Sequence, residues 1–213
     1  MIALGVVVLL LVAGGAWLLL ALRHVPRFYE EAGKVEPVKR KKGSDELLRR
    51  SATLHNDVIK PGQWQALFTA EQINGWLAVD LVQNHPKLLP PELHDPRVAI
   101  EAHRLRIGCL YEGEISTVAS IEAEVTLQEP NVIAVRIVRA RAGAVPLPLD
   151  KFMPRVVRAV QSAGFPVELR QIEADPVLII RVTPPADSRS HLTPVLESLE
   201  LRDNEIYVAG ESK

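Results

Sequence analysis

The feature that most constrains the fold is a change of hydrophobic period at Arg97. From residue 97 to residue 141 apolar side chains alternate with polar ones, which is typical of strands with one buried face. The longest alternation, residues 115–127, predicts a long curved strand after a hairpin formed by residues 97–111. Strands are also expected at residues 133–141, 167–171, 177–183, 196–202 and 205–209.

Arginines interrupt the alternation in the strand at residues 133–141. Arg139 and Arg141 fall on the apolar phase, so we expect a β-bulge near them to restore the register. With Arg136 they either face solvent or contact an anion or a lipid headgroup, and the pattern leaves both interpretations open.

Three segments have helical periodicity. Ser44 is a candidate N-cap for residues 45–58, Thr69 and Gln72 form a capping box for residues 70–81, and Asp150 is a candidate cap for residues 151–162. Gly75 either marks the close approach of another backbone or is simply tolerated. Helices followed by meandering strands predict an α+β fold with a bent, mostly antiparallel sheet against amphipathic helices.

The N-terminus contains a run of uncharged residues from Ile2 to Leu22. At about 1.5 Å per residue a helix of this length spans the hydrocarbon layer, so residues 1–22 are expected to be a transmembrane anchor. A cleaved signal peptide is disfavoured because no Lys or Arg precedes the run. Trp17, Arg23 and Arg27 suit the membrane interface. Residues 23–44 are expected to be a charged juxtamembrane linker, and residues 45–213 the folded domain.

Charge is unevenly distributed along the chain, although the formal net charge is only −1. Residues 23–50 hold nine Lys and Arg and five Asp and Glu, which leaves 16 and 21 for residues 51–213. By the positive-inside rule the basic stretch favours a cytoplasmic body, and it either attracts anionic lipid or serves as a solvated linker. A nucleic-acid partner is disfavoured, because no aromatic residues are interspersed with the lysine and arginine cluster.

Catalytic and metal-binding patterns are absent from the sequence. The six histidines form no HExxH motif, and the glycines form neither GxGxxG nor a Walker loop. The single cysteine, Cys109, is expected to be a small buried hydrophobic residue rather than a nucleophile. We therefore expect no enzyme activity, no cofactor and no metal.

Three segments carry a resemblance to a known family: residues 68–77 (FTAEQINGWL), 143–148 (GAVPLP) and 206–210 (IYVAG). With the N-terminal anchor, they resemble the YpmS-type family of membrane-anchored bacterial proteins, which is similar to the tubular lipid-binding (TULIP) domains. The resemblance implies a TULIP-like domain in which a curved antiparallel sheet wraps a helix around an apolar channel. It also implies an extracytoplasmic, non-catalytic domain that binds or senses lipid.

The sequence thus supports two hypotheses about function. In the first, the chain is a non-catalytic single-pass membrane protein whose domain binds lipid or another apolar ligand near the bilayer. In the second, it is a scaffold or accessory subunit of a cell-envelope complex, with a solid core, recognised by a protein partner through strand edges or through Leu88, Leu89 and Leu93. The candidate residues for a lipid-cavity lining are apolar and lie on predicted inner faces: Trp76, Leu77, Ile107, Ile121, Val125, Ile133, Val135, Val156 and Val160.

Overall fold

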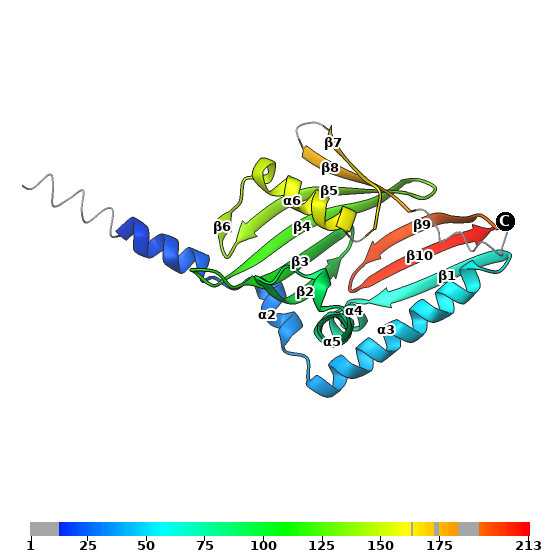
Figure 1. Ribbon diagram of the computed structural model, residues 1–213, viewed down its shortest axis with the longest axis horizontal. Coiled ribbons are helices and arrows are strands. Elements are labelled where there is room, and N and C mark those ends of the chain that lie inside the picture. The colour runs from blue at the N-terminus through cyan, green and yellow to red at the C-terminus, as the bar shows by residue number, and fades with distance from the viewer. Residues whose placement is uncertain (1–12, 163, 173–174, 183–191) are drawn as a thin grey trace, which may run out of the picture.

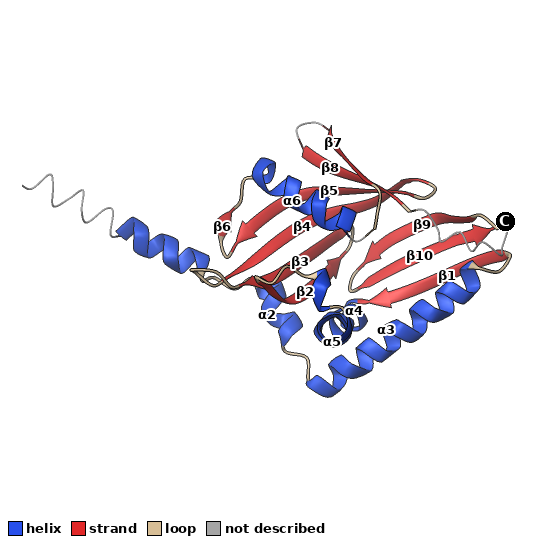
Figure 2. Cartoon of the chain, in the orientation of Figure 1, coloured by secondary structure: helices blue, strands red, loops and turns tan. Residues whose placement is uncertain are grey.

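The computed structural model describes residues 13–162, 164–172, 175–182 and 192–213, which form an α+β fold with a large antiparallel sheet and several helices (Figure 1). The large sheet has the order β2-β3-β4-β5-β8-β7, and β6 also pairs with β5. A second sheet has the order β1-β10-β9. The expected class is confirmed, but the strands divide into two sheets rather than one (Figure 2).

The strands of the large sheet are β2 (Leu93–Glu101), β3 (Arg104–Tyr111), β4 (Thr117–Glu129), β5 (Val132–Ala142), β6 (Val145–Pro146), β7 (Val167–Ile172) and β8 (Asp175–Arg181). Those of the small sheet are β1 (Gly62–Thr69), β9 (Pro194–Arg202) and β10 (Glu205–Ser212). The expected bulge is present, because the β4–β5 register shifts between Glu122, opposite Arg139, and Ala123, opposite Ile137. The hairpin turn expected near His103 is present as well, between the paired residues Glu101 and Arg104.

Strand β1 was not predicted. It pairs antiparallel with β10 over its full length, from Gly62 opposite Ser212 to Thr69 opposite Glu205. Its apolar alternation, Trp64, Ala66 and Phe68, is short and lies between two helices. Its partner is at the other end of the chain, so only tertiary structure shows that this segment is a strand.

The helices are α2 (Arg27–Gly33), α3 (Pro37–Val58), α4 (Ala70–Ala78), α5 (Asp80–Asn84) and α6 (Leu149–Ser162), with a short 3-10 helix η1 (Pro86–Leu88). The capping box of Thr69 and Gln72 is formed as predicted. Ser44 is not an N-cap. Helix α3 begins at Pro37, with Glu36 at the N-cap, and Ser44 lies buried within it. Much of residues 23–44, where we expected a linker, is therefore helical.

Helix α4 connects α3 with the edge of the large sheet. A Cβ atom on Gly75 would lie 2.5 Å from the carbonyl oxygen of Arg40 and 2.6 Å from the amide nitrogen of Ser44, so the two helix backbones are in contact. On its other side, the amide of Asn74 donates to the carbonyl of Val98 and accepts from the N–H of Val98, both at 2.8 Å. These bonds satisfy backbone groups of the edge strand β2 that no neighbouring strand reaches.

Residues 13–22 are helical, and the C-terminal end of this helix is attached to the large sheet. The Thr117 hydroxyl donates to the carbonyl of Leu22 at 2.6 Å, and the N–H of Ala144 donates to the carbonyl of Ala21 at 2.8 Å. Within the described residues, no helix is both long and apolar enough to cross a bilayer. The first twelve residues of the expected anchor lie outside the described part of the chain.

Hydrogen bonds made by turn residues join the small sheet to the large one at two places. At one end the N–H of His103 donates to the carbonyl of Leu201, and that of Asn204 donates to the carbonyl of Ile100. At the other end Asn131, in the β4–β5 turn, exchanges two hydrogen bonds with the backbone of Leu196. Strand β9 is therefore attached to the large sheet near both of its ends.

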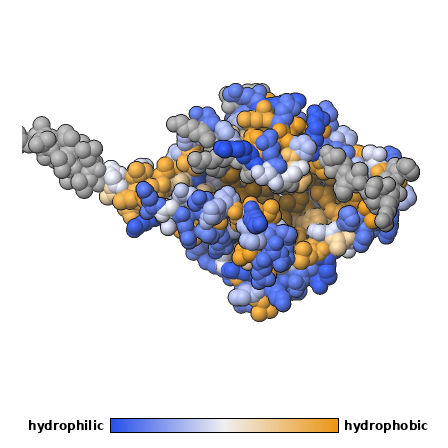
Figure 3. Space-filling view, viewed as in Figure 1, coloured by the Kyte–Doolittle hydropathy of each residue, from blue (hydrophilic) through white to orange (hydrophobic). Residues whose placement is uncertain are grey.

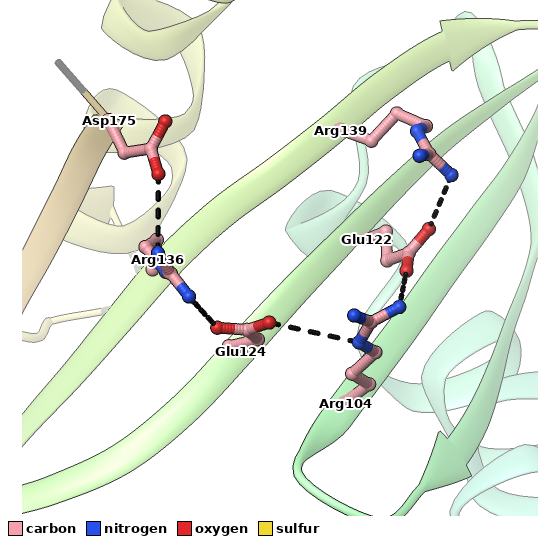
Figure 4. A network of polar contacts seen from close by, with 6 residues as sticks. All are labelled: Arg104, Glu122, Glu124, Arg136, Arg139 and Asp175. Carbon is pink, nitrogen blue, oxygen red and sulfur yellow. Dashed lines mark hydrogen bonds and ion pairs between the residues drawn. The ribbon is translucent and has the colours of Figure 1, made fainter.

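The face of the large sheet opposite to α6 carries a ladder of ion pairs (Figure 4). Arg104 reaches Glu122 at 2.9 Å and Glu124 at 3.7 Å, and Arg139 reaches Glu122 at 3.2 Å. Arg136 contacts Glu124 and lies 3.3 Å from Asp175. The ladder crosses β3, β4, β5 and β8, so this face is polar around Glu122 and Glu124, and Ile107, Ile121, Ala123 and Val125 lie on the other face. Arg136, Arg139 and Arg141 are all exposed, and the first two pair with carboxylates of the ladder.

Candidate functional site

The candidate site is the apolar face of the large sheet, opposite to the ion-pair ladder. Cross-strand pairing places Val98, Ile107, Ile121 and Ala140 in one row of this face. Figure 3 shows the same side of the molecule as hollowed and lined by hydrophobic residues at its centre, in the region between α6 and the small sheet. The arrangement presents a concave aliphatic surface.

Helix α6 covers one part of this face. Met153 is buried in a cluster with Ala123, Ile137 and Leu178, and three of the predicted lining residues, Ile121, Val135 and Val156, pack against that cluster. The structure therefore brings these three together. Because α6 packs on them, a ligand that reached them would have to displace part of this helix.

A second cluster joins the two sheets. Buried Ala70, Ile100 and Leu201 come from α4, β2 and β9, and the predicted lining residue Val125 packs against them together with Ile206 of the small sheet. The aliphatic surfaces of the two sheets are consequently continuous at this point.

The remaining predicted lining residues differ in their surroundings. Ile107 is 37% exposed although it faces the concave side, so it is open to an incoming molecule. Ile133 is half-buried opposite Leu127 and Ile180, and Val160 is half-buried on α6. Trp76 and Leu77 are half-buried on α4, where the Trp76 ring lies beside His85 with centroids 6.0 Å apart.

A cavity of about 580 Å³ opens at the seam between β4 and β9. Val125 and Leu127 line it from β4, and Leu199 and Leu201 line it from β9. Its volume is within the range of small-molecule pockets, and its lining combines aliphatic side chains with polar groups of β9 such as Glu200. Our sequence interpretation included Val125 but missed the β9 residues, because nothing in their alternation indicates that β9 faces the end of β4.

The predicted membrane-interface residues lie at the N-terminal end of the structure. Trp17 is 69% exposed on the helix of residues 13–22, and Arg23 and Arg27 are exposed just after it. Arg27 is the first residue of α2, which packs against β2.

Two ionisable groups near Asp95, one on α2 and one on β3, have shifted pKa values. Burial, reinforced by the negative charge of Asp95, raises the pKa of the Tyr29 hydroxyl to about 12 and that of the Cys109 thiol to about 11. Tyr29 donates to the backbone carbonyl of Asp95 at 2.8 Å, and the Arg97 guanidinium lies 4.2 Å from the centre of its ring. Cys109 is therefore a neutral thiol at ordinary pH. Among the described residues, no group of three His, Cys, Asp or Glu side chains is arranged to hold a metal ion.

Comparison of the chain with protein-family models, with curated proteins and with solved structures found no match.

Proposed function

We propose that this chain is a non-catalytic, single-pass membrane protein whose domain binds a lipid or another apolar ligand on its concave face, close to the bilayer. The observation that carries the proposal is the continuous aliphatic surface of the two sheets, with the solvent-accessible Ile107 and the seam cavity beside Val125. When an acyl chain covers an exposed apolar concavity of this kind, apolar surface is removed from water, which is favourable.

The proposed topology rests on the N-terminal segment. The uncharged run up to Leu22 has the length of a membrane span, and its end is hydrogen-bonded to Thr117 and Ala144 of the domain. This attachment would hold the domain close to the bilayer surface. We place the domain on the extracytoplasmic side, as the resemblance to YpmS-type proteins and their TULIP-like domains implies, although the basic residues 23–50 favour the other side.

The test is native mass spectrometry of the full chain, extracted from membranes in a neutral detergent. We expect an additional mass that fragments as lipid, and we expect Ile107→Trp to reduce its retention several-fold by filling the accessible part of the surface. Ile115→Trp is the matched control, because Ile115 is also 37% exposed but lies in the loop before β4.

A chain that carries no lipid and takes up none from added phospholipid vesicles would contradict the proposal. Equal retention by wild type, Ile107→Trp and Ile115→Trp would contradict the assignment of the concave face as the site.

The alternative function, a scaffold or accessory subunit of an envelope complex, is supported by a separate observation. Leu88 is 57% exposed and Val82 is 55% exposed on neighbouring segments, which is the kind of apolar patch that a protein partner covers. Crosslinking in intact cells, with Leu88→Asp as the variant, tests it. A discrete partner lost in this variant, from a chain that retains no lipid, would favour the scaffold.

A further inference from the structure

A second cavity, of about 250 Å³, lies on the polar face of the large sheet, next to the end of the N-terminal helix. Four arginines line it: Arg27 from the start of α2, Arg106 from β3, and Arg139 and Arg141 from β5. His24 also lines it, and Glu122 is the single acidic residue among the described residues of its lining. The chain segments that supply these side chains are far apart in sequence, so the cluster is a product of the fold.

Only part of this positive charge is neutralised. Arg106 pairs with Glu101 at 3.0 Å and Arg139 pairs with Glu122 at 3.2 Å. Within the described part of the chain, neither Arg27 nor Arg141 forms an ion pair. Two guanidinium groups at the cavity therefore have no carboxylate partner among the described residues.

The position of the cavity relative to the N-terminal helix is set by backbone contacts. Gly143 lines the cavity, and a Cβ atom at this position would overlap the carbonyl oxygens of Ala21 and Leu22. The same two oxygens accept the hydrogen bonds from Ala144 and Thr117. The arginines thus lie directly beyond the last apolar turn of the helix. If that helix is the membrane span of the proposed function, on which this step rests, the cavity lies at the depth of the lipid phosphates.

We propose that this cavity binds the phosphate group of an anionic molecule, with Arg27 and Arg141 as the principal donors. Guanidinium groups bind phosphate oxygens through paired, charge-assisted hydrogen bonds, and two of them lack a competing partner here. An anionic lipid headgroup and a free phosphate share this chemistry, and the test separates them.

The experiment measures binding to the full chain in neutral detergent micelles by isothermal titration calorimetry. The probes are short-chain phosphatidic acid, short-chain phosphatidylcholine and inorganic phosphate. The test variant is Arg27→Gln/Arg141→Gln. The matched control is Arg170→Gln/Arg181→Gln, which removes the same charge from two exposed arginines on β7 and β8, outside the linings of both this cavity and the seam cavity. We expect the test variant to weaken phosphatidic acid binding at least about tenfold, because it removes two sets of charge-assisted bonds, and the control to leave binding unchanged.

The probes identify the source of the phosphate. Much weaker binding of inorganic phosphate than of phosphatidic acid identifies a lipid headgroup, whereas equal binding of both identifies a free phosphate. Arg27→Lys/Arg141→Lys keeps the charge without the paired donors, and an intermediate affinity is expected for it. Thermal unfolding of each variant confirms that it is folded.

The proposal is overturned by an equal loss of affinity in test and control variants, by equal binding of phosphatidylcholine and phosphatidic acid, or by no binding of any probe. Its failure is distinguishable from failure of the concave site. Retention of lipid that is sensitive to Ile107→Trp but not to Arg27→Gln/Arg141→Gln would leave the proposed function intact.

Discussion

Among the residues that the structure describes, four other than glycine have positive φ angles, and each lies where a strand turns or bends. His103, Asn131 and Asn204 have φ values of 64°, 63° and 64° in tight hairpin turns, and Asp95 has 48° at the irregular part of β2 before Pro96. Asn, Asp and His tolerate this left-handed conformation better than other residues with a Cβ atom. The residue types at the turns therefore indicate locally where the chain reverses direction.

Cys109 allows a prediction at the residue scale. Because the pKa of its thiol rises from 9 to about 11 on folding, the folded state holds this proton more tightly than the unfolded state. The stabilisation is complete below about pH 9 and is lost as the pH rises from about 9 to about 11. We expect iodoacetamide to modify the folded protein at pH 8 far more slowly than the urea-unfolded protein, because the thiolate is the nucleophile.

The matched variant is Cys109→Ala. Between pH 9 and pH 10 its melting temperature should fall less steeply than that of the wild type. Most of the pH dependence of stability that comes from Tyr29 lies above this range. Identical pH profiles for the two proteins, or equal alkylation rates in the folded and unfolded states, would contradict the assignment of a shifted thiol pKa.

At the scale of elements, backbone contact decides how α3 and α4 pack. Gly43 and Gly75 face each other across the two helices, and a Cβ atom on Gly43 would lie 2.9 Å from the carbonyl oxygen of Glu71. The sequence left open whether Gly75 marked a close approach or was merely tolerated, and the structure confirms the close approach. The contact positions α4 so that Asn74 reaches the edge of β2.

Gly75→Ala tests this packing, because two physical effects predict changes of opposite sign in the free energy of unfolding. Helix propensity alone would stabilise the protein by about 1 kcal/mol. The new methyl group would meet backbone atoms of Arg40 and Ser44, which cannot move independently of α3, so we expect a net loss of about 1–3 kcal/mol in urea unfolding. The control is Ser51→Ala on the exposed face of α3, which should be neutral or slightly stabilising. A stabilised Gly75→Ala protein would show that the helices are not in backbone contact.

At the scale of the whole molecule, the joints between the two sheets shape the candidate site. The seam cavity lies between the β2–β3 turn and β9, so its walls come from different sheets. At one of these joints Asn131 uses its side chain as well as its backbone. Its side chain accepts from the N–H of Leu196 at 2.7 Å, its own N–H donates to the carbonyl of Leu196 at 3.1 Å, and its carbonyl accepts from Val182 at 2.9 Å.

Asn131→Gly should loosen the small sheet without straining the turn, since glycine keeps the positive φ angle. The substitution leaves the N–H of Leu196 without its acceptor, so we expect the free energy of unfolding to fall by about 1–3 kcal/mol. Hydrogen exchange should accelerate in β9 and β10 more than in β3 and β4. Asn204→Gly is the matched control, because Asn204 has the same φ angle and joins the sheets through its backbone groups. Equal acceleration by both substitutions would contradict a joint that depends on the Asn131 side chain.

Features that depend only on neighbouring residues could be predicted from the sequence. The capping box of Thr69 and Gln72, the bulge beside Arg139 and the alternation of β4 all follow from local chemistry and period. The sequence also indicated the apolar face on which Ile107, Ile121 and Val125 lie, because side-chain direction alternates strictly along a strand.

Tertiary structure alone decided the features that depend on pairing between distant segments. Strand β1 exists because β10 pairs with it, the strands divide into two sheets, and Ser44 lies inside a helix that starts seven residues earlier, at Pro37. The seam cavity and the four-arginine cavity belong to the same class. Their walls join segments up to about 120 residues apart, and the periodicity of one segment does not indicate which face of another segment it will contact.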